Sequence, residues 1–313
     1  IYTFTPTSHG VGRFDLKRHD FGTLAQKTYT TEASTTTLTI EKLGKIRTTL
    51  RLEGQYRNAD GTTYGEFKTR IRFYARTPYT RTYHTMIWTA NDGKGIASLA
   101  FVPKTTIGAG AQYHYGVDGS AANQASIDLF QTGANTLLTG SGAPAGSRLD
   151  GWLEARWTNN KLFTAVRWPW QQHPVRAEAQ GTTMKLHAIG PQAQTPMSLA
   201  PKDVVSPAGP PMNQQNYEDP YTNLRGHFSD DPIWHPTPIT PVVWHGEHGA
   251  YGQPLSPRGV GKTYEYLVWQ SSSTVASTQH AVLPAVRNAL LQKPVYAYAD
   301  PAHSVQAGLP TPL

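Results

Sequence analysis

The sequence predicts an all-β fold, a large antiparallel β-sandwich with long Pro/Gly-rich loops and one short C-terminal helix. Two observations predict this class. Thr, Tyr, Trp and Val are frequent, and these residue types favour strands. Gly and Pro fill 28 and 24 of the 313 positions and divide the chain with turns, whereas long helical patterns are nearly absent.

The composition excludes several classes of protein. Charged residues make up only 16% and aromatic residues 11% of the chain, which is untypical of a disordered chain or a coiled coil. The absence of Cys excludes disulfides, thiolate chemistry and Cys-type zinc sites. No run of about 18 apolar residues occurs, so we expect no membrane span.

The chain is basic, with 28 Lys+Arg against 21 Asp+Glu and a formal charge of +7. Such a surplus favours anionic partners by long-range attraction. The basic residues stand singly, as at Lys68, Arg70 and Arg72, and not in the basic run that is typical of nucleic-acid binding. A solvated strand face explains the same pattern. We expect an acidic polysaccharide as partner and no nucleic acid.

The first half of the chain predicts a meander of antiparallel strands. Alternation of apolar and polar residues predicts strands over residues 35–40, 46–56, 65–74, 81–90 and 96–102. Asp60 and Gly61 supply the left-handed positions of a hairpin turn. Lys68, Arg70 and Arg72 fall on one side of their strand, so the meander should have one wet, basic face.

The second half predicts further strands and one helix. Strands or fragments of strands are expected over residues 111–115, 126–129, 152–157, 162–168, 182–189 and 262–270. Residues 190–241 contain many prolines and predict a long loop or connector. A helix is expected over residues 276–291, where Val282 and Val286 belong to an apolar stripe.

Residues 167–174 form the densest aromatic and polar segment. Indole faces stack on sugar rings, and an Arg guanidinium pairs with carboxylates in a fork. We therefore predict that Arg167, Trp168, Trp170 and His173 bind substrate. Packing of the two tryptophans in a core or a corner is the alternative.

His245 and His248 flank Gly246 and Glu247 in a cluster that resembles a metal site. Their spacing of three residues and the neighbouring glycines predict a polar loop that lines a surface groove, so we expect no metal and no cofactor. The chain has no Gly-x-Ser-x-Gly elbow for a serine hydrolase. A pair of carboxylates for glycoside hydrolysis cannot be identified.

Several segments together resemble the β-rich region of the exo-rhamnogalacturonan lyase-like proteins, a family of polysaccharide lyases. The resemblance lies in residues 37–54, 67–75, 81–85, 167–174, 259–265 and 298–301, in the same order as in the family. Lys262 and Tyr264 depart from the family pattern. The similarity spans most of residues 35–301.

The resemblance implies a small N-terminal β-barrel, a central β-sandwich and a C-terminal α/α toroid. In this chain, residues 1–50 would be the end of the barrel-like part and residues 51–275 the sandwich. Residues 276–313 would be a short helix and a linker toward a missing helical domain. The chain begins at Ile1 without Met and ends in a Pro-rich stretch, which we interpret as a processed fragment of a longer protein.

A lyase of this kind removes the proton next to a uronate carboxylate and expels the 4-linked sugar. The reaction needs a cation to neutralise the carboxylate, a base and an acid. By residue type, Lys262 or Arg167 would neutralise the carboxylate, and His245, His248 or Tyr264 would transfer protons. We predict His245, His248, Tyr264 and Lys262 as catalytic residues; none of them needs a cofactor.

The alternative is a non-catalytic extracellular β-sandwich module that binds glycan or self-assembles. Under either hypothesis we expect a secreted or periplasmic protein without a membrane span. Its partners besides an acidic polysaccharide would be copies of itself, in a homo-oligomer or filament, or a helical domain from the same precursor. A Trp-lined basic groove would favour the enzyme, and a flat face with paired strand edges would favour assembly.

Overall fold

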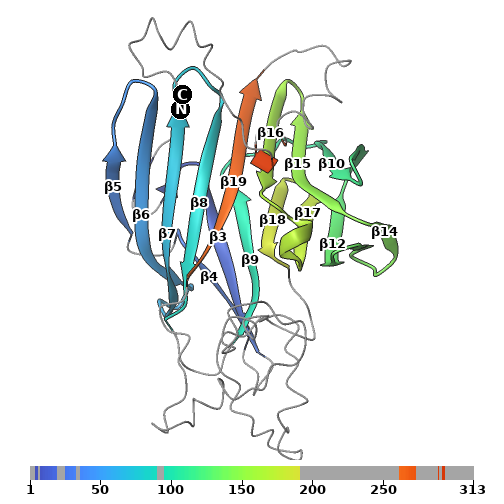
Figure 1. Ribbon diagram of the computed structural model, residues 1–313, viewed down its shortest axis with the longest axis horizontal. Coiled ribbons are helices and arrows are strands. Elements are labelled where there is room, and N and C mark those ends of the chain that lie inside the picture. The colour runs from blue at the N-terminus through green and yellow to red at the C-terminus, as the bar shows by residue number, and fades with distance from the viewer. Residues whose placement is uncertain are drawn as a thin grey trace, which may run out of the picture.

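The computed structural model describes residues 4–5, 8–19, 25–32, 36–89, 95–190, 261–272, 288 and 291–292. Apart from a short hairpin of β1 (Phe4–Thr5) and β2 (Ser8–His9), its strands form two antiparallel layers (Figure 1). The layers belong to one sheet because Thr30 pairs with Arg57 at a single position between β4 and β6. The predicted all-β sandwich is confirmed.

We call the first layer the β7 layer. In spatial order it consists of β5 (Thr37–Lys42), β6 (Arg47–Arg57), β7 (Thr63–Tyr74), β8 (Tyr79–Ile87), β19 (Gly261–Ser272), β16 (Asn160–Val166), β15 (Leu149–Trp157), β10 (Gln112–Val117) and β11 (Ser120–Gln124). The strand β19 enters this layer between β8 and β16 although it lies far from both in the sequence (Figure 1).

The second layer, the β9 layer, lies against the first. In spatial order it consists of β4 (Gln26–Thr30), β3 (Gly12–His19), β9 (Gly95–Pro103), β18 (Thr183–Ile189), β17 (Val175–Gln180), β12 (Ile127–Gly133), β13 (Thr136–Thr139) and β14 (Pro144–Gly146). Figure 1 shows β3 and β4 passing behind β8, with β9 to their right beside β18.

The inner faces of the two layers meet in an aromatic core. Phe14 of β3 stacks on His84 of β8 with ring centroids 3.5 Å apart, and it also contacts Phe101 of β9. The two ring nitrogens of His84 are hydrogen-bonded to the hydroxyls of Tyr56 and Thr69, so this buried polar ring is satisfied. Contacts between strands of different layers thus hold the sandwich together.

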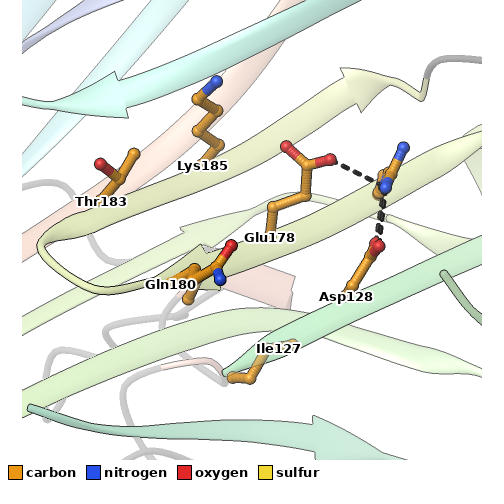
Figure 2. A pocket seen from close by; sticks show the side chains of 8 residues that line it. Ile127, Asp128, Glu178, Gln180, Thr183 and Lys185 are labelled. Carbon is orange, nitrogen blue, oxygen red and sulfur yellow. Dashed lines mark hydrogen bonds and ion pairs between the residues drawn. The ribbon is translucent and has the colours of Figure 1, made fainter. Parts of the chain in front are cut away.

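The outer faces of the layers differ. Rows of Arg, Lys and Glu cover the outer side of β6, β7 and β8. The outer side of the β9 layer is hollowed over β12, β17 and β18, where Asp128, Glu178 and Lys185 line a cavity of about 430 Å³ (Figure 2). The two faces therefore offer different chemistry to a ligand.

The helical part of the prediction is only partly covered by the described residues. Asn288, Leu291 and Gln292 are helical, and Leu291 is buried against the outer side of the β7 layer beside Trp152 and Leu267. The rest of the predicted helix and the predicted loop 190–241 lie outside the described residues. A separate 3-10 turn covers Trp170–Gln172.

The predicted division into domains stays a prediction. Its boundary at residue 50 falls inside β6, and β3, β4 and β5 pair within the same sheet as the later strands.

Candidate functional site

Basic side chains of neighbouring strands share the outer face of the β7 layer. Residues directly opposite each other in an antiparallel pair point to the same side of the sheet. One row joins Arg51 of β6, Arg70 of β7 and Tyr83 of β8, which confirms the predicted basic face. We call this surface the cationic face. Its cations are Arg47, Arg51, Lys68, Arg70, Arg72, Arg81 and Arg167, and its carboxylates are Glu41, Glu53 and Glu265.

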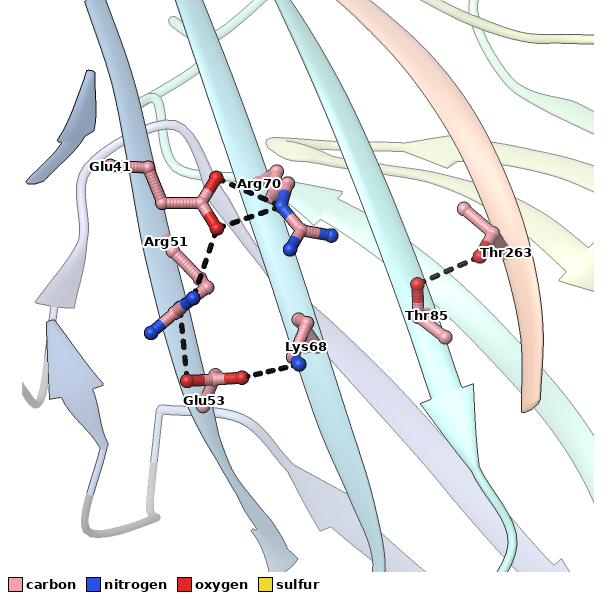
Figure 3. A network of polar contacts seen from close by, with 7 residues as sticks. All are labelled: Glu41, Arg51, Glu53, Lys68, Arg70, Thr85 and Thr263. Atoms are coloured by element: carbon pink, nitrogen blue, oxygen red, sulfur yellow. Dashed lines mark hydrogen bonds and ion pairs between the residues drawn. The ribbon is translucent and has the colours of Figure 1, made fainter. Parts of the chain in front are cut away.

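Two glutamates offset the repulsion between neighbouring cations on this face. Arg51 and Arg70 lie directly opposite each other, and such like charges repel. Glu41 accepts hydrogen bonds from Arg70 Nε at 2.8 and 3.0 Å and from an Arg51 nitrogen at 3.1 Å (Figure 3). The hydrogen bonds from Arg70 lower the pKa of Glu41, and the bond from Arg51 lowers it to a smaller extent. Glu53 joins Arg51 to Lys68 in the same way (Figure 3).

Arg72 is held by an aromatic ring. Its guanidinium carbon lies 4.4 Å from the centroid of the Tyr83 ring, and it donates a hydrogen bond of 3.2 Å to the Tyr83 hydroxyl. Arg72 faces Arg81 directly across β7 and β8. Within the described ranges no carboxylate pairs with Arg72. Of the cations on this face, Arg72 is therefore well placed to bind a carboxylate of a ligand.

Arg167, one of the predicted substrate-binding residues, lies on the cationic face. Its guanidinium donates to Glu265 at 2.8 Å, and Arg81 approaches the other oxygen of the same carboxylate at 3.3 Å. The Arg167 guanidinium also lies 4.2 Å from the centre of the Trp168 ring system. Glu265 is buried, so this arrangement fixes Arg167 between a carboxylate and an indole.

Trp168 is the exposed aromatic residue next to this pair. Its side chain is 45% exposed, and its backbone has φ 54°, a conformation that is costly for a bulky residue. The backbone N–H of Trp168 donates a hydrogen bond of 2.8 Å to the side-chain oxygen of Gln292, and this bond helps to hold the backbone in place. The Arg167 guanidinium covers part of this indole, and the exposed remainder can stack on a sugar ring.

Trp170 begins the 3-10 turn that follows Trp168, and His173 comes directly after this turn. The guanidinium of Arg148 stacks 4.3 Å from the centre of the Trp170 ring system, so this indole face already has a partner. His173 is exposed, and its Nδ1 lies 3.1 Å from the carbonyl oxygen of Trp170. The substrate-binding roles of both residues stay predictions.

Of the predicted catalytic residues, the two that the structure describes, Tyr264 and Lys262, do not lie on this face. Tyr264 points into the core opposite His84, and burial raises the pKa of its hydroxyl above the ordinary value. Lys262 is exposed on the same side of β19 as Tyr264, with Nζ 5.7 Å from the centre of the Tyr264 ring. His245 and His248 lie outside the described residues. The catalytic assignment of the four residues remains a prediction.

Within the described part of the chain, no three His, Asp or Glu side chains are grouped so that they could hold a metal ion. The same part of the chain contains no helix with the length and apolar character of a membrane span.

Sequence reasoning missed the carboxylates that organise this face. Glu265 is 98 positions from Arg167 and 184 from Arg81, so no local pattern indicates that the three groups meet. The alternation that placed Arg70 and Arg72 on one side also placed Glu53 on the polar side of its own strand. The alternation of polar and apolar residues was the available signal for these carboxylates, but it does not show which strands pair with each other.

Residues 12–116, from β3 to β10, match the family model described as "PcRGLX-like protein central beta sandwich domain". No curated protein matches the chain in sequence.

Similar solved structures are distant. A protein of glycosyl hydrolase family 38 from Enterococcus faecalis has 8% identity and a TM-score of 0.46, and the match covers 89% of this chain and 28% of that one. An α-mannosidase from Enterococcus faecalis V583 has 8% identity and a TM-score of 0.44, with the same coverage of 89% and 28%. The Slr1438 protein from Synechocystis sp. PCC 6803 has 11% identity and a TM-score of 0.33, and the match covers 78% of this chain and 68% of that one. The chain thus spans less than a third of the first two structures.

Proposed function

We propose that this chain recognises an acidic, pectin-type polysaccharide as the β-sandwich part of a rhamnogalacturonan-lyase-like protein. The observation that carries the proposal is the cationic face, where Arg72 lacks a carboxylate partner among the described residues and Arg167 stands beside the exposed indole of Trp168. The match of residues 12–116 to the PcRGLX-like central domain supports the same class of protein.

The chemistry of the face suits a uronate. Guanidinium groups bind carboxylates through paired hydrogen bonds, and an indole face covers the C–H side of a sugar ring. The fixed glutamates Glu41, Glu53 and Glu265 orient the neighbouring cations, so little side-chain entropy is lost when a ligand binds.

Binding is tested with oligomers of rhamnogalacturonan and with neutral dextran oligomers of similar length, by isothermal titration calorimetry. We expect the acidic oligomer to bind and dextran to bind at least about tenfold more weakly. Replacement Arg72→Gln should weaken binding of the acidic oligomer about tenfold, since a hydrogen bond to a charged group contributes roughly 1.5–3 kcal/mol. Trp168→Ala should also weaken it, because it removes the indole that stacks on the sugar ring. Lys104→Gln, which changes a cation paired with Glu32 on the other layer, is the matched control.

Equal binding of both oligomers, or unchanged binding by both variants, would contradict the proposal. Catalysis is followed separately through the ultraviolet absorbance of the unsaturated uronate. In that reaction the C5 proton leaves, a C4–C5 double bond forms, and the C4–O bond breaks as the leaving oxygen takes a proton.

The alternative, a non-catalytic module that binds glycan, is favoured by one observation. Tyr264 lies in the core, and Lys262 lies on the opposite side of β19 from Arg167 and Glu265, so these groups do not converge on the cationic face. Binding of the acidic oligomer without any rise in absorbance would support this alternative.

A further inference from the structure

The outer face of the β9 layer contains a trough that is separate from the cationic face. Its floor is β9, where Ser98 and Ala100 are small, and its walls carry the longer side chains of β3, β18 and β17. The trough consists of two cavities of about 250 and 430 Å³. They share Arg176, Glu178 and Lys185, so they form one continuous surface.

Arg176 is fixed in the wall of the trough by two carboxylates. Its guanidinium binds Asp128 through two hydrogen bonds of 2.7 and 2.8 Å and lies 2.9 Å from Glu178. Figure 2 shows Asp128 of β12 and Glu178 of β17, each joined by a dashed line to the same guanidinium, with Gln180, Thr183 and Lys185 around the same cavity. The polar groups of this wall are thus held in place before a ligand arrives.

His187 extends this group toward the floor. It lies directly opposite Ala100 of β9 and Arg176 of β17, and its Nε2 is 3.0 Å from Glu178. The side chain is 6% exposed, and within the described residues its Nδ1 has no hydrogen-bond partner. A buried polar atom without a partner is costly, so this nitrogen is a group that a ligand or a bound water can satisfy.

The charges of the trough balance. Its acidic residues are Asp15, Asp128 and Glu178, and its basic residues are Lys17, Arg176 and Lys185. Burial lowers the pKa of His187, so this imidazole is neutral near neutral pH. A charged ligand of either sign would meet three groups of its own sign in the trough. An uncharged ligand with many hydroxyls can instead donate to the carboxylates and accept from the lysines and Arg176.

We propose that the trough is a second binding site, which takes a neutral, hydroxyl-rich ligand such as an uncharged saccharide unit. The larger cavity has the size of pockets that hold small molecules. Mixed fixed charges that face each other across a narrow floor match hydroxyl groups, which act as donors and acceptors at once. The inference is independent of the proposed function, since it concerns the outer face of the other layer and an uncharged ligand in place of an acidic one.

The test uses the full chain and ligand-observed saturation-transfer NMR with the methyl glycosides of galactose, glucose, mannose and rhamnose at millimolar concentration. The methyl glycoside of galacturonic acid, whose carboxylate is ionised at neutral pH, is included as the charged counterpart of the galactoside. We expect transfer to at least one neutral glycoside and at least about fivefold weaker transfer to the uronate.

Two variants locate the binding. Ala100→Leu fills the floor and should abolish the transfer without changing a charge, because the side chain points out of the sheet into the trough. Lys185→Met should weaken it about tenfold by removing a donor while keeping the length of the side chain. Arg72→Gln on the cationic face is the control and should leave the transfer unchanged. Near-ultraviolet circular dichroism verifies that each variant is folded.

Absence of transfer to every neutral glycoside would overturn the proposal. So would transfer that survives in both folded trough variants, or a uronate that binds more tightly than the neutral glycosides. If the Arg72→Gln variant no longer bound the neutral glycosides, their site would lie on the cationic face. This result would equally contradict the proposal of a site in the trough.

Discussion

The hydrogen bond between His187 and Glu178 shows how a local environment sets the charge of single residues. The bond from His187, together with Arg176 and Lys185 nearby, lowers the pKa of Glu178 to about 2. Burial lowers the pKa of His187 below its ordinary value of 6.5 despite the neighbouring carboxylate. At neutral pH Glu178 is therefore ionised and accepts the Nε2 proton, which leaves Nδ1 as an acceptor.

These shifts predict that acid destabilises the fold. Below about pH 6.5 the unfolded state protonates this histidine while the folded state does not, so the free energy of unfolding falls. Between pH 4.5 and about 2 the unfolded Glu178 takes up a proton before the folded one does, so the free energy of unfolding falls further. The variant His187→Gln should lose less stability than the wild type between about pH 7 and 5 in urea unfolding.

The difference between wild type and variant is the quantity that matters, because every other group is the same in both proteins. Lys17→Met, which removes a charge from the same trough but no histidine, is the control and should keep the wild-type slope. Parallel pH profiles of His187→Gln and wild type would contradict the assignment of a neutral, buried imidazole.

Single residues were predictable where alternation alone decides the side of a strand. Arg70 and Arg72 were placed on one face, and the register confirms this. Tyr264 was expected at a site because of its residue type, yet its position in β19 turns the ring into the core. His187 and Glu178 were not recognised as a pair, because the contact needs the β17–β18 hairpin to close in one particular register.

Strands were predictable where their apolar residues are β-branched or aromatic and alternate with polar ones, as in β7. β17 was missed because its buried positions after Val175 are alanines, which have little preference for strands. The order of strands was not predictable either. β19 was expected as a strand, but nothing local indicates that it pairs with β8 on one side and β16 on the other.

The central position of β19 predicts that the sandwich depends on it. Tyr266 and Val268 are fully buried in the shared core, and β8 and β16 would each expose an unpaired edge without this strand. A chain that ends at residue 190 should therefore lose cooperative unfolding and near-ultraviolet circular dichroism and should bind a hydrophobic dye.

A chain that ends at residue 272 is the matched control, because it keeps β19. It loses Leu291, which is buried beside Trp152 and Phe163, so we expect it to fold but to be about 2–5 kcal/mol less stable, as for a buried leucine truncated to alanine. Cooperative unfolding of the shorter chain with the same midpoint as the control would show that β19 is dispensable.

For the whole molecule, composition and turn signals were sufficient to predict an all-β sandwich, since strand-forming residues and frequent Gly and Pro leave few other classes. The assignment of strands to layers was not predictable, because the two layers alternate irregularly along the chain. Among the described strands they join only where Thr30 pairs with Arg57. The consequence of that layering is that the basic face and the trough lie on opposite outer surfaces.

This separation predicts two different responses to salt. Attraction between exposed charges is largely screened beyond about 10 Å at 0.1 M ionic strength. Binding of acidic rhamnogalacturonan oligomers to the cationic face should therefore weaken about tenfold or more when sodium chloride rises from about 0.02 to 0.5 M, since several guanidinium groups take part. Binding of a neutral methyl glycoside in the trough should change less than about twofold, because no net charge is brought to a surface whose charges already balance. Calorimetry and saturation transfer on the same protein sample measure both responses. A common salt dependence of the two ligands would mean that they share one surface, and it would contradict the assignment of separate sites to the two layers.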